Sequence, residues 1–278
     1  MLRSEYVEVV ARALSEDLGE HGDITAEACV PEAAESKAVF MARAPAVVAG
    51  LEVAAFVFEA LDPSVTFESL VVDGARVVER SGVARVAGRS RSILGGERTA
   101  LNLLGRMSGV ATATAGLVDL VAGTGAKISD TRKTMPGLRA LDKYAVRVGG
   151  GVNHRFGLYD AVMIKDNHLI AAGSITDAVA AARASVGPDV MLVVEVAELE
   201  QLREVLATDA DRVLLDNMSP DRLREAVAMV DGRIVTEASG GVTSQNIREI
   251  AETGVDIISV GWITHSAPQV DIALDFLS

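Results

Sequence analysis

The spacing of hydrophobic residues changes along the chain, and the first part mixes two periods. Apolar residues recur every three or four positions in some stretches, as in helices, while others are rich in Val and Phe, as in strands. The predicted elements are helices at 5–18, at 51–61 and from 92, and strands at 37–48, 71–75 and 83–88. The first part therefore predicts a mixed α/β layer.

The second part of the chain alternates short apolar runs with helical segments. The apolar runs cover residues 126–133, 161–166, 191–195, 212–216, 233–237 and 257–261. The helical segments cover residues 175–184, 198–206, 221–230 and 244–253. Alternating strands and helices predict parallel strands that are buried on both faces. Six runs are fewer than the eight strands of a closed barrel, so we expect a short or incomplete α/β barrel.

Charged residues stand where several of these apolar runs end. They are Lys133, Lys165, Glu195, Asp216 and Glu237. In a parallel barrel the functional site lies at the carboxyl ends of the strands. Any one of these residues is equally well explained as a polar marker of a strand end, but a ring of five favours a site.

Composition and charge narrow the classes of function. The 278 residues include 39 Asp and Glu against 26 Lys and Arg, so the net charge of −13 disfavours nucleic acids and anionic membranes as partners. The one cysteine, Cys29, excludes an internal disulfide and a cysteine metal cluster, and we predict that it is buried. The acidic N-terminus is unlike a signal peptide, and no uninterrupted apolar span is present, so we expect a soluble cytoplasmic protein.

A basic segment lies inside this acidic chain. Residues 127–168 hold eight Lys and Arg against four Asp and Glu, which predicts a focused anion site. The segment contains three consecutive glycines followed by Val-Asn-His-Arg at 149–155, without the Gly-Lys-Ser/Thr of a P-loop. The side chains suited to neutralising carboxylates and phosphates are Arg132, Lys133, His154, Arg155 and Lys165.

Other strand ends favour a cation and a phosphate. Glu195 and Asp216 have the hard oxygen ligands that suit a divalent cation or sugar hydroxyls. Residues 239–241 (Ser-Gly-Gly) and 260–262 (Val-Gly-Trp) follow the last two runs, where free backbone N–H groups can bind phosphate. The pattern predicts a sugar phosphate and a second, carboxylate-bearing ligand.

Motifs along nearly the whole chain resemble the quinolinate phosphoribosyltransferase family. In one-letter code they are EDLG at 16–19, GDIT at 22–25, ERTALN at 97–102, SGVAT at 108–112, DTRKTMPGLR at 130–139, KYAV at 143–146, GGGVNHR at 149–155, IKDNH at 164–168, LDNM at 215–218, EASGG at 237–241 and GWITHS at 261–266. The resemblance implies a type II phosphoribosyltransferase fold. An N-terminal α/β sandwich at 1–108, to which 267–278 returns, is joined to an open, catalytic α/β barrel at 109–266.

The resemblance also implies an activity and an assembly. Quinolinate and 5-phosphoribosyl 1-diphosphate would give nicotinate mononucleotide, pyrophosphate and CO₂ with Mg²⁺, in de novo NAD biosynthesis. The expected assembly is a homodimer, or an assembly of dimers, with a shared active site.

The resemblance also implies a role for individual residues of this chain. Those expected around the quinolinate carboxylates are Arg132, His154, Arg155 and Lys165, with Arg98 from the neighbouring subunit. Those expected at the phosphoribosyl diphosphate are the catalytic Lys133, Glu195 and Asp216, of which the two carboxylates would hold Mg²⁺ directly or through water. The remaining substrate contacts are expected from Thr131, Ser239, Gly240, Gly241, Val260, Gly261, Trp262 and His265, with the 5-phosphate held by Ser239, Gly240, Gly261 and His265. His168 receives no role. From spacing alone, Arg98 is more often a surface ion-pair residue, and His265 is equally well explained as a capping histidine.

Two departures and four alternatives remain open at this level. Val193 stands where the family commonly has a second glutamate, and Trp262 stands where a small residue is frequent. A paralogue found with molybdate-transport proteins lacks the Thr-Arg-Lys-Thr, Asn-His-Arg and Lys-Asp-Asn-His sets that this chain keeps. A nicotinate phosphoribosyltransferase would not need so many cations, a Schiff-base aldolase would use Lys165, and a sensor or scaffold would leave the charged residues idle.

Overall fold

The computed structural model describes residues 1–277, and the described chain separates into two compact units. The first unit consists of Met1–Ala115, Thr134–Gly150 and the residues from Ile263 onward. The second unit consists of Gly116–Lys133 and Gly151–Trp262. Helix α4 (Ser90–Leu120) runs through position 108, so the division expected at 108/109 stays a prediction about the domains.

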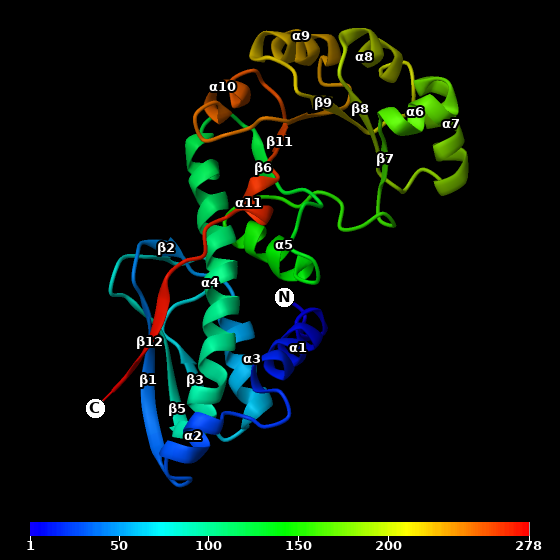
Figure 1. Cartoon of the computed structure of the whole chain (residues 1–278). Helices are drawn as coiled ribbons and strands as arrows, with labels where there is room; N and C mark the ends of the chain where they lie inside the picture. The colour runs from blue at the N-terminus through cyan, green and yellow to red at the C-terminus, as the bar shows by residue number, and fades with distance from the viewer. Residues whose placement is uncertain (278) are drawn as a thin grey trace. The chain divides into compact units, whose positions relative to one another are not determined.

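The first unit contains an antiparallel sheet with helices (Figure 1). The sheet has the strand order β12-β1-β5-β3, with β1 at Glu35–Ala42, β3 at Thr66–Ser69, β5 at Gly82–Arg89 and β12 at Ile272–Phe276. A small pair is formed by β2 (Ala46–Val47) and β4 (Arg76–Val77). Besides α4, the helical elements are η1 (Arg3–Glu5), α1 (Val7–Leu18), α2 (Ile24–Cys29), α3 (Leu51–Leu61), α5 (Arg139–Val148) and α11 (Trp262–His265), of which Trp262 is assigned to the second unit.

The predicted strand at 71–75 is wrong, and Asp73 gives the physical reason. Its carboxylate oxygens accept hydrogen bonds from the backbone N–H groups of Gly50 and Leu51, at 3.0 and 3.1 Å. These groups begin α3 and would otherwise lack partners, so Asp73 stabilises a helix start from a turn. The helix predicted at 51–61 is confirmed.

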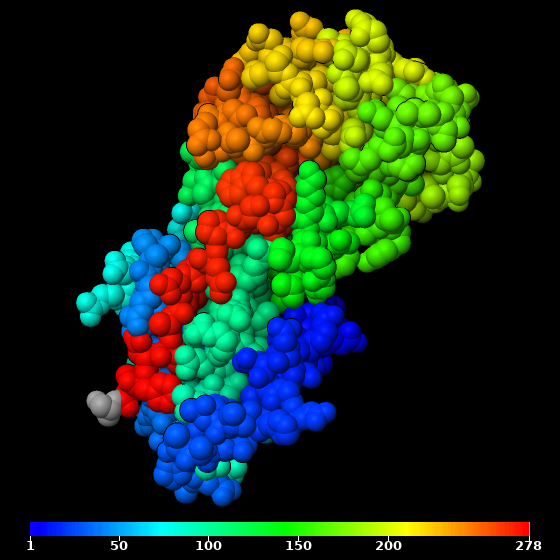
Figure 2. Space-filling model, in the orientation of Figure 1, coloured from blue at the N-terminus to red at the C-terminus, as the bar shows by residue number. Residues whose placement is uncertain are grey.

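The end of the chain returns to the first unit and packs against α4. Strand β12 pairs with β1 in antiparallel register, from Ala38 opposite Phe276 to Ala42 opposite Ile272. Before it, residues 268–270 cross α4 where two glycines lie: a Cβ on Gly109 would lie 2.2 Å from the carbonyl oxygen of Pro268. Figure 2 shows this segment lying over α4 on the surface. The glycines thus let two backbones approach closely.

The second unit is built around a parallel sheet, as the alternating pattern predicts. Among the described residues its strand order is β6-β11-β10-β9-β8-β7, and every pair is parallel (Figure 1). The strands are β6 (Lys127–Ser129), β7 (Val162–Ile164), β8 (Leu192–Val196), β9 (Arg212–Asp216), β10 (Val235–Ser239) and β11 (Ile257–Ser259). The helices are α6 (Asp166–Ala172), α7 (Ile175–Val186), α8 (Leu199–Val205), α9 (Pro220–Val230) and α10 (Ile247–Ala251). Within residues 1–277, β6 and β7 stand at the two ends of this order and do not pair with each other, which confirms the open barrel.

Two further observations complete the fold. Cys29, predicted to be buried, is exposed: it ends the short helix α2, whose buried residue is Ala26. Within residues 1–277, no single helix has the length and apolar character to cross a membrane, although the bent pair α6 and α7 passes that test when taken together.

Candidate active site

Most of the predicted site residues lie at one edge of the parallel sheet in the second unit. Glu195 lies near the end of β8, while Asp216 and Ser239 are the last residues of β9 and β10. Further residues follow the strand ends directly: Thr131, Arg132 and Lys133 after β6, Lys165 after β7, and Val260, Gly261 and Trp262 after β11. Because parallel strands have their carboxyl ends at the same edge, the topology gathers these residues there.

The sheet register places several polar side chains at one level. Ser129, Ser259, Ser239 and Asp216 stand opposite one another across β6, β11, β10 and β9. Residues at matching positions of neighbouring parallel strands point to the same face, and Glu237, two residues before Ser239, shares it. The hydrogen bond from the Ser259 hydroxyl to Glu237 Oε1 agrees with this orientation.

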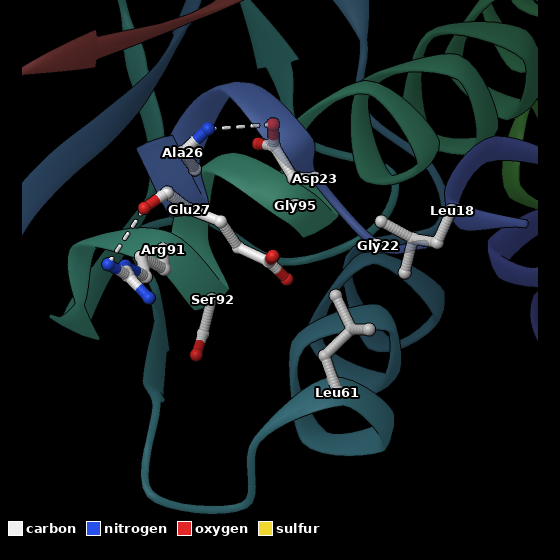
Figure 3. Close-up of a pocket in the computed structure, with 9 residues that line it drawn as sticks. All are labelled: Leu18, Gly22, Asp23, Ala26, Glu27, Leu61, Arg91, Ser92 and Gly95. Atoms are coloured by element: carbon white, nitrogen blue, oxygen red, sulfur yellow. Dashed lines mark hydrogen bonds between the residues drawn. The ribbon is translucent and has the colours of Figure 1, made fainter. Parts of the chain in front are cut away.

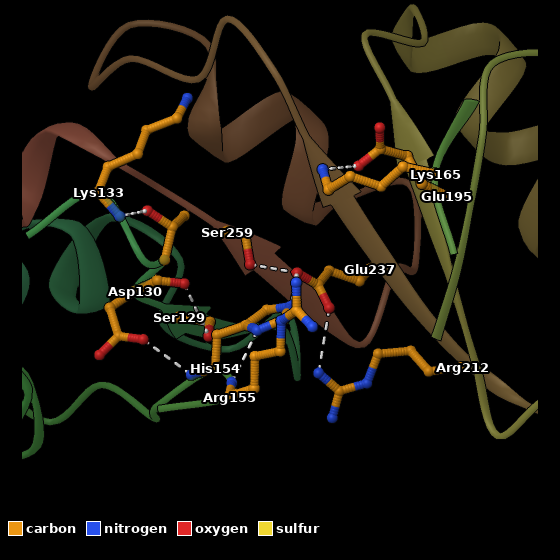
Figure 4. A network of polar contacts seen from close by, with 11 residues as sticks. Ser129, Asp130, Lys133, His154, Arg155, Lys165, Glu195, Arg212, Glu237 and Ser259 are labelled. Carbon is orange, nitrogen blue, oxygen red and sulfur yellow. Dashed lines mark hydrogen bonds and ion pairs between the residues drawn. The ribbon is translucent and has the colours of Figure 1, made fainter. Parts of the chain in front are cut away.

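Lys165 and Glu195 form an ion pair between the ends of β7 and β8 (Figure 4). Lys165 Nζ donates to Glu195 Oε2, and the lysine side chain is half-exposed. Val193 is buried and points to the same face as Glu195, so an apolar group stands where the family commonly has a second carboxylate. Asp216 Oδ2 accepts a hydrogen bond from Asn217 Nδ2 at 2.8 Å.

In the loop after β10, position 240 has space for backbone but not for a side chain. Gly240 has φ +95°, and a Cβ there would lie 2.2 Å from Asn217 Oδ1. Gly241 follows with φ +60°, also in the left-handed region. Two successive residues in such conformations suit glycine and leave backbone N–H groups unhindered by side chains. This geometry suits the phosphate contact predicted for residues 239–241.

Arg155, one of the predicted cationic residues, is held at one nitrogen and, in the part of the chain that the structure describes, lacks a partner at another. Its Nη1 donates to the carbonyl oxygen of Ala161 at 3.0 Å, while its buried Nε has no hydrogen-bond partner within residues 1–277. Burial, and next the nearby Arg132 guanidinium, lowers the pKa of Arg155 below the ordinary arginine value. Both causes disfavour the positive charge, so an anion placed beside Arg155 would relieve an existing electrostatic cost.

His154 lies against residues whose roles the sequence did not predict. Its Nε2 is 3.5 Å from Glu237 Oε1, and Glu237 Oε2 accepts from Arg212 Nη1 at 3.0 Å (Figure 4). Asp130 accepts from the His154 backbone N–H at 2.8 Å. In the sequence, Glu237 is a charge at a strand end and Asp130 is part of a motif, so both positions carried a signal of function. Arg212, at the start of β9, carried none.

Arg98 and His265 belong to the first unit, and His168 has a local hydrogen-bond partner. Arg98 is exposed on α4 in the first unit. His265 is exposed at the end of α11, and its Nδ1 lies 2.5 Å from Ser266 Oγ, also in the first unit. His168 Nδ1 accepts the backbone N–H of Lys165 at 3.0 Å and so caps the start of α6. The substrate roles of Arg98 and His265 stay predictions.

A separate pocket of about 230 Å³ lies in the first unit (Figure 3). Its lining includes Leu18, Asp23, Leu61 and Ser92 and contains none of the predicted site residues. Asp23 is engaged by the start of α2, because its Oδ1 accepts from the backbone N–H groups of Thr25 and Ala26. This pocket is therefore distinct from the strand-end residues.

Comparison with family models and curated relatives gives matches along the chain. Residues 23–108 match the model described as "Quinolinate phosphoribosyl transferase, N-terminal domain", and residues 110–275 match the corresponding C-terminal domain. The chain is 46% identical over 273 residues to a nicotinate-nucleotide pyrophosphorylase [carboxylating] of Mycobacterium leprae, covering 96% of both chains. It is 43% identical over 260 residues to a probable protein of that name from Bacillus subtilis, covering 94% of this chain and 89% of the relative.

The fold is also similar to solved structures. The nicotinate-nucleotide pyrophosphorylase of Francisella tularensis superimposes with a TM-score of 0.96 at 38% identity. The superposition covers 100% of this chain and 98% of that structure. The similarity therefore includes both units.

Proposed function

Since the chain belongs to the quinolinate phosphoribosyltransferase family, we propose that it transfers the phosphoribosyl group of 5-phosphoribosyl 1-diphosphate to quinolinate with decarboxylation. The products are nicotinate mononucleotide, pyrophosphate and CO₂, and the reaction supplies NAD biosynthesis. The observation that carries the proposal is the set of cationic and anionic side chains at the carboxyl edge of the parallel sheet. The cytoplasmic location expected from the sequence stays a prediction.

The chemistry requires both signs of charge at this edge. Quinolinate is a dianion and the diphosphate is a polyanion, so the two repel each other unless cations compensate them. Arg132, Arg155 and Lys165 would bind the quinolinate carboxylates, and Lys133 would stabilise negative charge on the departing pyrophosphate. As the pyridine nitrogen bonds to C1 of the ribose, Glu195 and Asp216 would favour the positive charge that develops on the sugar.

Decarboxylation needs no further group from the protein. Once the pyridine nitrogen bears the ribose, the ring is cationic and accepts the electron pair left when the bond to the 2-carboxylate breaks. A proton from water then takes the position that CO₂ leaves. The protein also holds the two anions in reacting geometry, which lowers the entropic cost of the transfer.

Substrate choice tests the function directly. We expect incubation with quinolinate, 5-phosphoribosyl 1-diphosphate and Mg²⁺ to release CO₂ and nicotinate mononucleotide in equal amounts. Nicotinate, offered in parallel, is expected to react poorly because it lacks the second carboxylate that the basic residues would bind. Equal or faster turnover of nicotinate would show that the chain is a nicotinate phosphoribosyltransferase instead.

Magnesium is part of the proposal and rests on the chemistry of two carboxylates. Glu195 and Asp216 offer hard oxygen ligands near the ends of the neighbouring strands β8 and β9. Mg²⁺ usually takes one or two protein carboxylates and completes its shell with water and substrate phosphates, so these two residues fit it. When bound, Mg²⁺ would supply positive charge beside the diphosphate. Within residues 1–277, no group of three or more His, Cys, Asp or Glu side chains is placed to hold a metal.

Metal removal gives a second test. Chelation with EDTA is expected to lower turnover by more than about 100-fold and added Mg²⁺ to restore it. Asp216→Asn should raise the Mg²⁺ concentration that gives half-maximal activity, because one ligand charge is lost. Glu252→Gln is the control, since this exposed glutamate follows α10 and pairs with Arg248, away from the carboxyl ends of the strands. An unchanged Mg²⁺ requirement in Asp216→Asn would remove Asp216 from the metal site.

The proposal includes a homodimer in which Arg98 reaches the site of the partner. Its support is the family resemblance together with the exposure of Arg98 on α4. Mixing Arg98→Ala protein with Lys133→Ala protein, each inactive alone, should restore about one quarter of wild-type activity. Half of randomly exchanged dimers would then be mixed, each with one intact site. No recovery despite subunit exchange, shown by differently tagged chains, would exclude a shared site.

A further inference from the structure

A buried hydrogen-bonded group centred on Glu237 lies beside His154 and Arg155 (Figure 4). Glu237 is 0% exposed; its Oε2 accepts from Arg212, and its Oε1 accepts from the Ser259 hydroxyl. Burying a carboxylate costs free energy unless it is paired and hydrogen-bonded, and a well-packed apolar residue avoids that cost. These partners explain how β10 tolerates the charge. The third neighbour, His154 Nε2 at 3.5 Å from Oε1, indicates what the charge is for.

The two ring nitrogens of His154 have different partners. The backbone N–H of Arg155 donates to Nδ1 at 2.7 Å, so Nδ1 is an acceptor and carries no proton. The proton of the neutral ring then lies on Nε2, which faces Glu237, as the hydrogen-bond partners assign it. The His154 side chain is 7% exposed. His154 thus connects the buried carboxylate to the backbone of Arg155.

Asp130 holds the same segment from the end of β6. Its Oδ1 accepts the backbone N–H of His154 at 2.8 Å, and its Oδ2 accepts Asn153 Nδ2 at 2.6 Å. Asp130 is buried, as is Glu237. The segment from which the Arg155 side chain leaves is therefore held by Asp130 through its backbone and lies against Glu237 through the His154 ring.

Arg155 is the residue whose position these contacts determine. Its Nη1 is engaged by the carbonyl oxygen of Ala161, and its Nε is buried without a hydrogen-bond partner within residues 1–277. A buried donor without a partner is costly, so a carboxylate that accepted from Nε would satisfy it. Such a contact depends on direction, and the backbone of Arg155 sets that direction.

We propose that Glu237 is a positioning residue that acts through neutral His154 to set the backbone of Arg155, so that the Arg155 guanidinium meets a quinolinate carboxylate. The inference rests on the function proposed above and deepens it. In this inference His154 is a neutral link between Glu237 and the backbone of Arg155. The family resemblance implies instead that His154 is a cationic ligand of a quinolinate carboxylate.

The first test is the kinetic behaviour of the Glu237→Gln holoenzyme. We expect kcat/KM for quinolinate to fall by about 10- to 100-fold, as for a small displacement of a binding group, while the KM for 5-phosphoribosyl 1-diphosphate changes by less than about twofold. The control is Asp256→Asn, because Asp256 accepts from Thr236 on the same strand without contacting His154. Equal loss for both substrates would indicate general damage to the fold and would overturn the inference, as would an unchanged kcat/KM.

The second test distinguishes His154 as a neutral link from His154 as a cationic ligand. It does not need the Glu237 variant to fold. His154→Asn keeps an oxygen near the position of Nδ1 that can accept the Arg155 N–H, while His154→Leu keeps no acceptor. If His154 is a neutral link, His154→Asn should retain at least about tenfold more activity than His154→Leu. Equal loss in both variants would support the cationic ligand instead. His21→Asn is the control, since His21 is exposed in the first unit.

The third test separates this inference from the proposed function. In the ¹⁵N NMR spectrum of histidine-labelled full-length protein, His154 should show a neutral ring protonated at Nε2, with and without quinolinate. The assignment comes from the spectrum of His154→Asn, which lacks the signal. An imidazolium signal would overturn the inference that His154 is a neutral link, even if the enzyme uses quinolinate. If the protein does not turn over quinolinate, the proposed function fails, while the NMR signal still reports the geometry.

Discussion

Replacing Arg155 by alanine is expected to lower kcat/KM for quinolinate by about 1,000-fold, which is the scale for removing one preorganised charged donor from an active site. Stability should change little, because the substitution also removes a buried Nε that has no hydrogen-bond partner. Steady-state kinetics and thermal unfolding measure the two effects separately. Arg155→Lys should recover only part of the loss, since a lysine offers a point charge without the planar pair of donors.

Arg203→Ala is the matched control for this prediction. Arg203 is exposed on α8 and pairs with Glu200 on the same helix, at 3.0 Å. Removing it changes the charge of the protein as Arg155→Ala does, but away from the strand ends. Wild-type kcat/KM in Arg155→Ala would contradict the carboxylate contact, and a comparable loss in Arg203→Ala would show that the effect is one of net charge.

Asp142→Ala is expected to destabilise the protein by about 3–5 kcal/mol, because it leaves the largely buried guanidinium of Arg106 without its carboxylate partner. Asp142 is 0% exposed, and its two oxygens accept from Arg106 Nε and Nη2, each at 3.0 Å. It also accepts the backbone N–H of Met135 at 3.1 Å, while Arg106 donates to the carbonyl oxygen of Thr264. The pair thus joins α4, the 134–150 segment and the returning chain within the first unit. Urea unfolding followed by circular dichroism measures the loss.

The apolar double variant Arg106→Met with Asp142→Leu tests the cause. Burial raises the pKa of Asp142, with the Arg106 guanidinium opposing that shift, so the charged pair does not fully offset the cost of its own burial. Replacing both partners should therefore recover much of the stability that Asp142→Ala loses. Asp221→Ala, at an exposed pair on α9, is the control and should have little effect. A double variant no more stable than Asp142→Ala would show that the hydrogen bonds, and not the lone charge, account for the loss.

The strands of the parallel sheet could be predicted from the sequence where their burial is uniform along the chain. Parallel strands covered on both faces are apolar runs, which is why the six runs overlap β6 to β11. The start predicted for the helix at 92 lies within α4, but its extent to Leu120 was not predicted. Gly105 and Gly109 lower helix propensity locally, and they stand there because the returning residues 268–270 pack against them.

One predicted element is wrong because a residue bonds to a partner distant in the chain, and one predicted burial is wrong because residue type alone does not determine exposure. Val71 and Val72 gave an apolar run that was interpreted as a strand, whereas the neighbouring Asp73 bonds to the start of α3. Cys29 was predicted to be buried from its residue type, but it stands at the exposed end of a short helix. Residue type and local spacing do not contain the information about such partners.

By itself, the sequence determined the family, the open parallel barrel and the strand-end residues, because motifs and apolar runs are local properties of the chain. Only the tertiary structure decided that Glu237, Arg212 and Asp130 support His154 and Arg155. Glu237 lies on β10, Arg212 on β9 and Asp130 directly after β6, while His154 and Arg155 lie in the loop after Val152. The contacts between them depend on distances that exist only once the strands are aligned.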